Sequence, residues 1–401
     1  MSDTHTAHQV NSPGDASPKP SQTGDLVSYL TRAVDAYEEW MRKRVAPASS
    51  PPDRPYKSLY PFDVEDGDLF FGRASATRAL FQAVLADRLT VLHAKAAAGK
   101  TSVLNAGLSP HLIREGRLPL NVRSYEDPVA TIKRAIVQLL CEPEPDALSK
   151  LTLYQFLSLV CSRVSGETRE LVIILDQFEQ FFIFWPEQSY RRSFVAALAE
   201  CYDDRSLPVR FVIALRKEYF SDLAEFQSRI PNVLHNEYRL GPMTQEQAYM
   251  AIVGPVAKLS RPVAYEPALL DVMVTDLTCA GAGPSFGGNV ALIPAKGLRE
   301  PQVGAGDEAQ AVLKGPVEEV EPLRLQLICA QLYEVLEKDT AYPDGAVAVT
   351  LASYQNLGRA AGEVGHYLRG VLHRLPEHQQ SVARELLQEL VGAGGTRRVL
   401  S

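Results

Sequence analysis

The hydrophobic and polar positions of this 401-residue chain follow an α/β pattern between residue 56 and about residue 238. Short apolar runs alternate there with stretches of helical spacing, as expected where helices cover both faces of a parallel sheet. The candidate strands are Thr90–His93, Leu118–Val122, Leu171–Leu175 and Val209–Leu215. The candidate helices between them are Thr101–Glu115, Val129–Cys141, Leu151–Val164 and Tyr190–Cys201.

Beyond Leu240 the apolar runs fade and helical spacing dominates. We predict helices at Thr244–Leu259, Glu266–Leu277 and Pro322–Glu337, with Thr244 as an N-cap. Residues 280–321 are rich in Gly, Ala and Pro and lack periodicity, which predicts a long loop. Two further helices are predicted over Ala360–Leu390, followed by a turn and a strand at Thr396–Val399.

The N-terminal region divides into three parts. Residues 1–23 have the composition of a disordered tail, and residues 46–54 that of a Pro/Ser linker. Residues 24–44 carry apolar side chains at helical spacing, which predicts an amphipathic helix. Its apolar face either binds a partner protein, as a small adaptor would, or packs back on the core of this chain.

Composition narrows the range of functions. The formal net charge is −7, which argues against general nucleic-acid binding. No N-terminal signal peptide and no apolar run long enough for a bilayer is found in the sequence. The five cysteines are scattered, as is typical of reduced thiols in a cytoplasmic protein.

Two stretches carry the candidate chemistry. The five apolar residues Leu171–Leu175 predict a strand buried on both faces, and Asp176 then lies at the C-terminal edge of a parallel sheet, where ligands collect. Upstream, an apolar strand leads into Gly99, Lys100 and Thr101 at the start of a helix. Amides at such a helix start, a lysine and a hydroxyl are the parts that bind phosphate and Mg²⁺ in a P-loop. We therefore expect Thr101 and Asp176 at the metal.

The phosphate loop is poor in glycine. Ala94 occupies the position of the first glycine in the pattern G-x-x-x-x-G-K-[ST]. A Cβ at this position restricts the backbone conformations with positive φ that glycine adopts freely. We therefore expect nucleotide binding with slow hydrolysis.

The order of motifs from about residue 56 to the end resembles the bacterial novel STAND NTPases. Phe62 to Arg73 is similar to the family's F-x-x-x-D-x-x-x-F-F-G-R, and Gly99 to Leu112 to its G-K-S-S-L-x-x-A-G-L-x-P-x-L. Asp176 to Gln180 is similar to D-Q-F-E-E, and Val212 to Arg216 to a strand that ends in arginine. Pro322 to Leu327 matches a further segment.

This resemblance implies a P-loop α/β domain at 56–240, a helical lid at 241–350 and a winged helix at 351–401, apparently truncated. It implies a nucleotide-gated signalling switch, as in bacterial antiphage defence, which uses ATP, ADP and Mg²⁺ and self-assembles on activation. Phe71, Gly72 and Arg73 should lie by the adenine and ribose. The expected phosphate ligands are Ala98, Gly99, Lys100, Thr101 and Ser102. Arg216 should sense the terminal phosphate, and Pro322 should pack on the base.

Several departures from the family pattern concern hydrolysis. Ala94 and Ala97 replace two loop glycines, and Gln180 replaces a glutamate. Glu179 remains as the candidate for polarising water, or it pairs locally; Arg216 likewise either senses phosphate or forms an ion pair. Two alternative functions stay open: a hydrolysis-deficient, nucleotide-bound scaffold that binds partner proteins, and a DNA-associated AAA+ ATPase.

Overall fold

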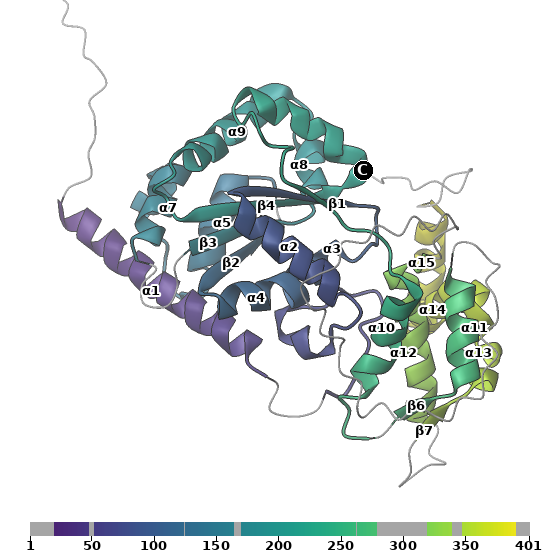
Figure 1. The fold of residues 1–401 in the computed structure, drawn as a ribbon. Helices are drawn as coiled ribbons and strands as arrows, with labels where there is room; N and C mark the ends of the chain where they lie inside the picture. Colours follow the sequence, from purple (N-terminus) through teal and green to yellow (C-terminus); the bar gives the residue numbers. More distant parts are fainter. Residues whose placement is uncertain are drawn as a thin grey trace, which may run out of the picture.

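The computed structural model describes residues 20–47, 52–123, 125–163, 170–261, 263–278, 319–338 and 347–389. Figure 1 shows an α/β domain with a second, mainly helical part beside it, formed by the green and yellow segments beyond residue 241. Residues 1–19 of the predicted tail, residues 280–318 of the predicted loop and the predicted strand at Thr396–Val399 lie outside the described residues. Residues 20–23, predicted as the end of the tail, are helical instead.

The α/β domain contains a parallel five-stranded sheet in the order β2-β3-β4-β1-β5. The strands are β1 (Leu89–Ala94), β2 (Arg117–Val122), β3 (Glu170–Leu175), β4 (Val209–Arg216) and β5 (Glu237–Arg239). All four predicted strands are confirmed. The pattern missed β5 because this edge strand has only three residues, two of them charged and exposed.

Strand β3 shows why five apolar residues follow one another. Leu171, Ile173 and Leu175 enter the core on one face of the sheet, whereas Val172 and Ile174 enter a separate core on the other face. All five are fully buried. The strand therefore delivers Asp176 to the C-terminal edge of the sheet with both of its faces covered.

Helices cover both faces of this sheet (Figure 1). Those on the chain up to β2 are α1 (Pro20–Val45), η1 (Val64–Leu69), α2 (Ala74–Ala86), α3 (Lys100–Ser102), η2 (Val103–Leu108) and α4 (Ser109–Arg114). Those after β2 are α5 (Pro128–Val137), α6 (Asp146–Lys150), α7 (Leu153–Cys161), α8 (Glu179–Phe184), α9 (Gln188–Asp203) and η3 (Lys217–Ser228). Segments α3, η2 and α4 are consecutive, so the helix predicted after the phosphate loop is present and carries a π-helical middle.

Helix α1 packs on the α/β domain. Its apolar residues, among them Leu30, Ala33 and Val34, are buried in the same core as β2 and β3. The Tyr37 hydroxyl donates a hydrogen bond to the Pro119 carbonyl oxygen of β2 at 3.0 Å. Of the two alternatives for this helix, the structure thus has the one in which its apolar face packs back on the chain.

The second part of the structure, from Gly241 onward, has its own core, and we keep the name lid for its residues up to 350, as in the sequence prediction. Its elements are α10 (Gln245–Val256), β6 (Val263–Tyr265), α11 (Pro267–Leu277), α12 (Pro322–Lys338), β7 (Val347–Val349), α13 (Leu351–Asn356), α14 (Arg359–Arg374) and α15 (Glu377–Glu389). Thr244 caps α10 in a capping box with Gln247, as predicted. Tyr56 also belongs to this core, which ties the start of the predicted α/β domain to the lid. The described residues beyond 350 form helices, and the winged helix stays a prediction.

Candidate functional site

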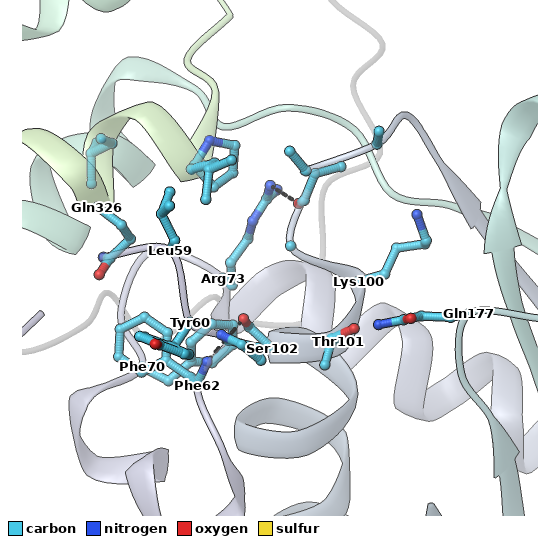
Figure 2. Close-up of a pocket in the computed structure, with 18 of the residues that line it drawn as sticks. Leu59, Tyr60, Phe62, Phe70, Arg73, Lys100, Thr101, Ser102, Gln177 and Gln326 are labelled. Carbon is cyan, nitrogen blue, oxygen red and sulfur yellow. Dashed lines mark hydrogen bonds between the residues drawn. The ribbon is translucent and has the colours of Figure 1, made fainter. Parts of the chain in front are cut away.

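A cavity of about 650 Å³ opens at the C-terminal edge of the sheet, between the α/β domain and the lid. The phosphate loop lines one part of it, from Ala96 to Ser102. Lid residues, among them Met243, Pro322 and Gln326, line the opposite part. Figure 2 shows the two parts, with Lys100 and Thr101 on one side of Arg73 and Leu59 and Gln326 on the other. A ligand that fills this cavity would contact both domains.

The phosphate loop turns at Ala97 rather than at Ala94. Ala94 is the last residue of β1 and pairs with Arg216 of β4 in ordinary strand geometry. Ala97 has a φ of 61° and Gly99 a φ of 88°. The expectation of a conformational penalty at Ala94 is therefore wrong. The residue with a left-handed backbone, which a Cβ disfavours, is Ala97.

Lys100 and Thr101 stand at the start of the helix that follows the loop. The Lys100 side chain is buried, and its Nζ donates to the carbonyl oxygens of Ala94 and Lys95, both at 3.4 Å. Burial lowers the pKa of Lys100, and the nearby carboxylates of Glu179 and Asp176 oppose this effect. The long contacts leave the ammonium able to accept a better partner, such as a phosphate oxygen.

Asp176 lies beside Thr101, as the two motifs predicted. The Thr101 hydroxyl donates to Asp176 Oδ2 at 2.7 Å. Asp176 is 2 % exposed, and burial raises the pKa of its carboxyl, against the opposing effects of Thr101 and Arg123. A hydroxyl and a carboxylate in contact are hard oxygen ligands, which suit Mg²⁺.

Two contacts of Asp176 were missed at the sequence level. Arg123, next after β2, places its Nε 3.2 Å from Asp176 Oδ2. The buried Tyr125 donates its hydroxyl to the Asp176 carbonyl oxygen at 2.6 Å. Both residues follow the end of a predicted strand, which is the signal that could have found them. Gln177, the next residue after Asp176, adopts a φ of 58°.

Glu179 and Arg216 contact each other. Arg216 Nε lies 3.1 Å from Glu179 Oε1, and the Arg216 amide donates to Oε2 at 3.2 Å. Glu179 is 6 % exposed, and both residues line the cavity. In the described structure, Glu179, the candidate base, and Arg216, the candidate phosphate sensor, thus form an ion pair with each other. Local pairing was the alternative that the sequence analysis kept for both residues.

The residues expected by the adenine and ribose differ in position. Phe71, Arg73 and Pro322 line the cavity. A Cβ on Gly72 would lie 2.2 Å from the Gln247 carbonyl oxygen, so this glycine packs directly against α10.

Ser102, expected at the phosphates, accepts a hydrogen bond from the Phe62 amide at 3.1 Å, which Figure 2 marks with a dashed line. Leu59, Tyr60, Phe62 and Phe70 also line the cavity and were not predicted there.

None of the described helices combines the length and the apolar character that a membrane crossing requires.

Several solved structures are similar to the chain at low sequence identity. The Aeropyrum pernix ORC2 protein, in its ADPNP-ADP complexes, is 16 % identical with a TM-score of 0.48, over 85 % of this chain and 81 % of that one. The Aeropyrum pernix ORC1 protein in complex with DNA is 16 % identical with a TM-score of 0.45, over 83 % and 81 %. The Walker-type ATPase paby2304 of Pyrococcus abyssi is 11 % identical with a TM-score of 0.43, over 83 % and 80 %.

Comparison with curated proteins gave no match. Residues 55–401 match the family described as Novel STAND NTPase 1. This range contains the phosphate loop, the strand that ends at Asp176 and every lid residue that lines the cavity. The chain therefore belongs to the Novel STAND NTPase 1 family and has the α/β fold of a P-loop NTPase.

Proposed function

We propose that the chain binds ATP and ADP with Mg²⁺ in this cavity and acts as a nucleotide-gated switch. The observation that carries the proposal is the 2.7 Å hydrogen bond between Thr101 and Asp176, next to the buried Lys100. Loop amides at the start of a helix lack intrahelical partners and point at an anion. Mg²⁺, held by Thr101 and Asp176, would neutralise charge on the phosphates.

Gating follows from the two-sided lining of the cavity. The loop residues would hold the phosphates, whereas Met243 and Pro322 would contact the base from the lid. A ligand shifts a conformational equilibrium only by as much as it binds one state better. One nucleotide in contact with both domains has that differential affinity. The family resemblance is the basis for proposing a role in signalling, such as bacterial defence.

Slow hydrolysis is part of the proposal. In the described state Glu179 is engaged by Arg216 through two contacts. Glu179 can polarise water only after Arg216 releases it, and Arg216 can reach a terminal phosphate only after the same separation. The same pair favours, as a second candidate, a nucleotide-bound scaffold without turnover. Measured ATP turnover that Asp176→Asn abolishes would exclude the scaffold.

Nucleotide binding is tested by titrating ADP and Mg²⁺ into the full chain and into Lys100→Ala. Loss of a buried charge-assisted contact to phosphate should weaken binding by roughly 100-fold. Lys95→Ala is the matched control, since Lys95 is an exposed lysine of the same loop, and it should bind as the unchanged chain does. Equal affinity of all three proteins would refute the proposed site.

A further inference from the structure

Arg73 is a buried cation whose guanidinium donates to three backbone carbonyl oxygens. Its side chain is 4 % exposed. Nη1 donates to the carbonyl oxygens of Gly241 and Pro242, at 2.9 and 3.3 Å. Nη2 donates to the Ala98 carbonyl oxygen at 3.1 Å, the contact dashed in Figure 2. One guanidinium thus joins the phosphate loop to the point where the chain passes into the lid.

The contact with Ala98 fixes the direction of the next amide. The peptide group between Ala98 and Gly99 is planar and trans, so its C=O and N–H point in opposite directions. Because Arg73 binds the oxygen, the Gly99 N–H is turned to the opposite side of the loop. Ala97 and Gly99 both have positive φ, so this peptide group lies between two turns that depend on its orientation.

The residues before Arg73 fit closely against the lid. A Cβ on Gly72 would meet the Gln247 carbonyl oxygen at 2.2 Å and Met243 Cε at 2.8 Å. A Cβ on Gly254 would meet the Phe71 ring at 2.3 Å. Both lid contacts involve α10 or the residues just before it. The segment Phe71–Arg73 is therefore a joint between domains, in addition to lining the cavity.

We propose that Arg73 is a positioning residue that couples the shape of the phosphate loop to the position of the lid. This inference rests on the proposed function and concerns the regulation of the same site. When the lid moves away, Gly241 and Pro242 leave the guanidinium, which then keeps only one of these three carbonyl partners, that of Ala98. Arg73 then shifts, and the Ala98–Gly99 peptide loses its fixed orientation. Lid position thereby sets phosphate affinity without a contact between Arg73 and the nucleotide.

The test uses two probes on the full chain, ADP and inorganic tripolyphosphate, each competing with a fluorescent ADP derivative. A residue that shapes the loop acts on both probes, whereas a residue that reads adenine or ribose acts on ADP alone. Arg73→Ala should weaken both by the same factor, about tenfold or more. Arg78→Ala, which removes an exposed arginine of α2, the helix that follows Arg73, should change neither. Weaker ADP binding with unchanged tripolyphosphate binding would overturn the proposal, as would no change in either.

Arg73→Lys keeps the charge but cannot span the three carbonyls. It is the second variant of the test and replaces Arg73→Ala if that variant fails to fold. Without ligand, its backbone hydrogen exchange should be faster both at residues 96–100 and at residues 240–244. Faster exchange at the loop alone would contradict the coupling. Because this exchange measurement needs no ligand, it tests the coupling even if the unchanged chain binds neither probe. Failure of the unchanged chain to bind either probe would refute the proposed function instead.

Discussion

Strand β3 has a carboxylate at each end, and the structure surrounds the two differently. At its start, Glu170 accepts from Arg117 Nε and Arg210 Nε, both at 2.9 Å. Burial acts to raise the pKa of Glu170, but the two arginines outweigh it, and the net pKa is lowered. After its end, Asp176 has a pKa that burial raises, and its cationic partner Arg123 is 42 % exposed.

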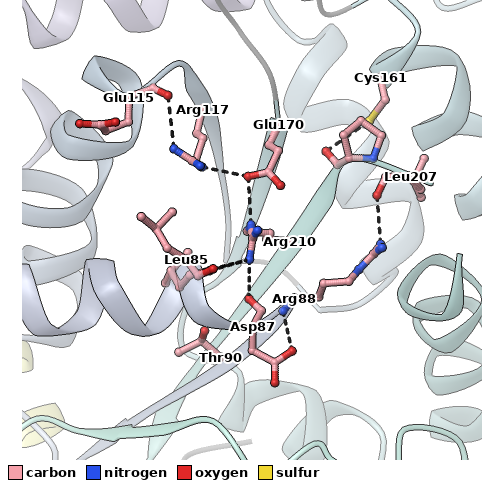
Figure 3. Close-up of polar contacts among 12 residues, drawn as sticks. Leu85, Asp87, Arg88, Thr90, Glu115, Arg117, Cys161, Glu170, Leu207 and Arg210 are labelled. Carbon is pink, nitrogen blue, oxygen red and sulfur yellow. Dashed lines mark hydrogen bonds and ion pairs between the residues drawn. The ribbon is translucent and has the colours of Figure 1, made fainter. Parts of the chain in front are cut away.

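The same contrast holds for the two edges of the sheet. At the N-terminal edge, Arg210 Nη1 also donates to the carbonyl oxygens of Val84, Leu85 and Asp87, around the end of α2 (Figure 3). Arg88 binds three carbonyls around the end of α9. Cations at helix C-termini are stabilising. The C-terminal edge instead has a left-handed Ala97 and a desolvated Lys100. At one edge the charges are paired within the fold, whereas the other edge keeps strained and desolvated groups, as expected of the proposed binding site.

Glu170→Gln should give the largest loss of stability. It leaves two partly buried arginines without their carboxylate, which costs about 2–3 kcal/mol in the free energy of unfolding. Urea denaturation at neutral pH measures this. Glu115→Ala is the control, because Glu115 is exposed at the same edge, and it should be neutral. Undiminished stability of Glu170→Gln would break the comparison.

The pH dependence of this loss has a definite sign. Since the folded pKa of Glu170 lies below its ordinary value of 4.5, its contribution is present above pH 4.5 and disappears as pH falls through the folded pKa. The stabilities of the unchanged chain and of Glu170→Gln should therefore converge in acid. A constant difference down to the lowest pH at which both proteins fold would contradict the assignment.

Asp176→Asn should act in the opposite direction. The folded state disfavours the Asp176 charge, so a neutral amide should stabilise the nucleotide-free chain by about 1 kcal/mol, while Mg²⁺-dependent binding is lost. The half-exposed pair with Arg123 opposes this gain only weakly. Urea denaturation in the presence of a chelator measures the effect. A destabilised variant would show that Asp176 serves the fold as Glu170 does.

Ala97→Gly should have the smallest effect. It removes a left-handed alanine, and after the entropy cost of glycine the gain is about 0.5 kcal/mol. Ala94→Gly is the control, because Ala94 is buried in β1 and glycine weakens a strand. Thermal unfolding of the two variants should therefore shift in opposite directions. A gain in Ala94→Gly would restore the sequence-based expectation.

The sequence predicted the parts of the site that depend on one local pattern. The apolar run before Asp176 and the Gly-Lys-Thr at a helix start placed Asp176 and Thr101 close together, and the two side chains are in contact, whereas their role at a nucleotide stays a prediction. What it could not predict depends on distances across the fold. The pairing of Glu179 with Arg216 joins the start of α8 to the end of β4, and the contacts of Arg73 reach a residue 168 positions away. The conformational penalty expected at Ala94 is wrong because a spacing rule does not say where a strand ends, and the left-handed residue is Ala97, which the family pattern also gives as a replaced glycine.

The central claim is that one nucleotide holds both domains, and hydrogen exchange of the full chain with and without ADP and Mg²⁺ tests it most directly. We predict slower exchange in two places at once: the loop at residues 96–102, and the lid segments at residues 243–251 and 322–326, which contribute Met243, Ala251, Pro322 and Gln326 to the same cavity. Lys100→Ala should show neither effect at the same ADP concentration. Protection confined to the loop, with the lid unchanged, would contradict the claim.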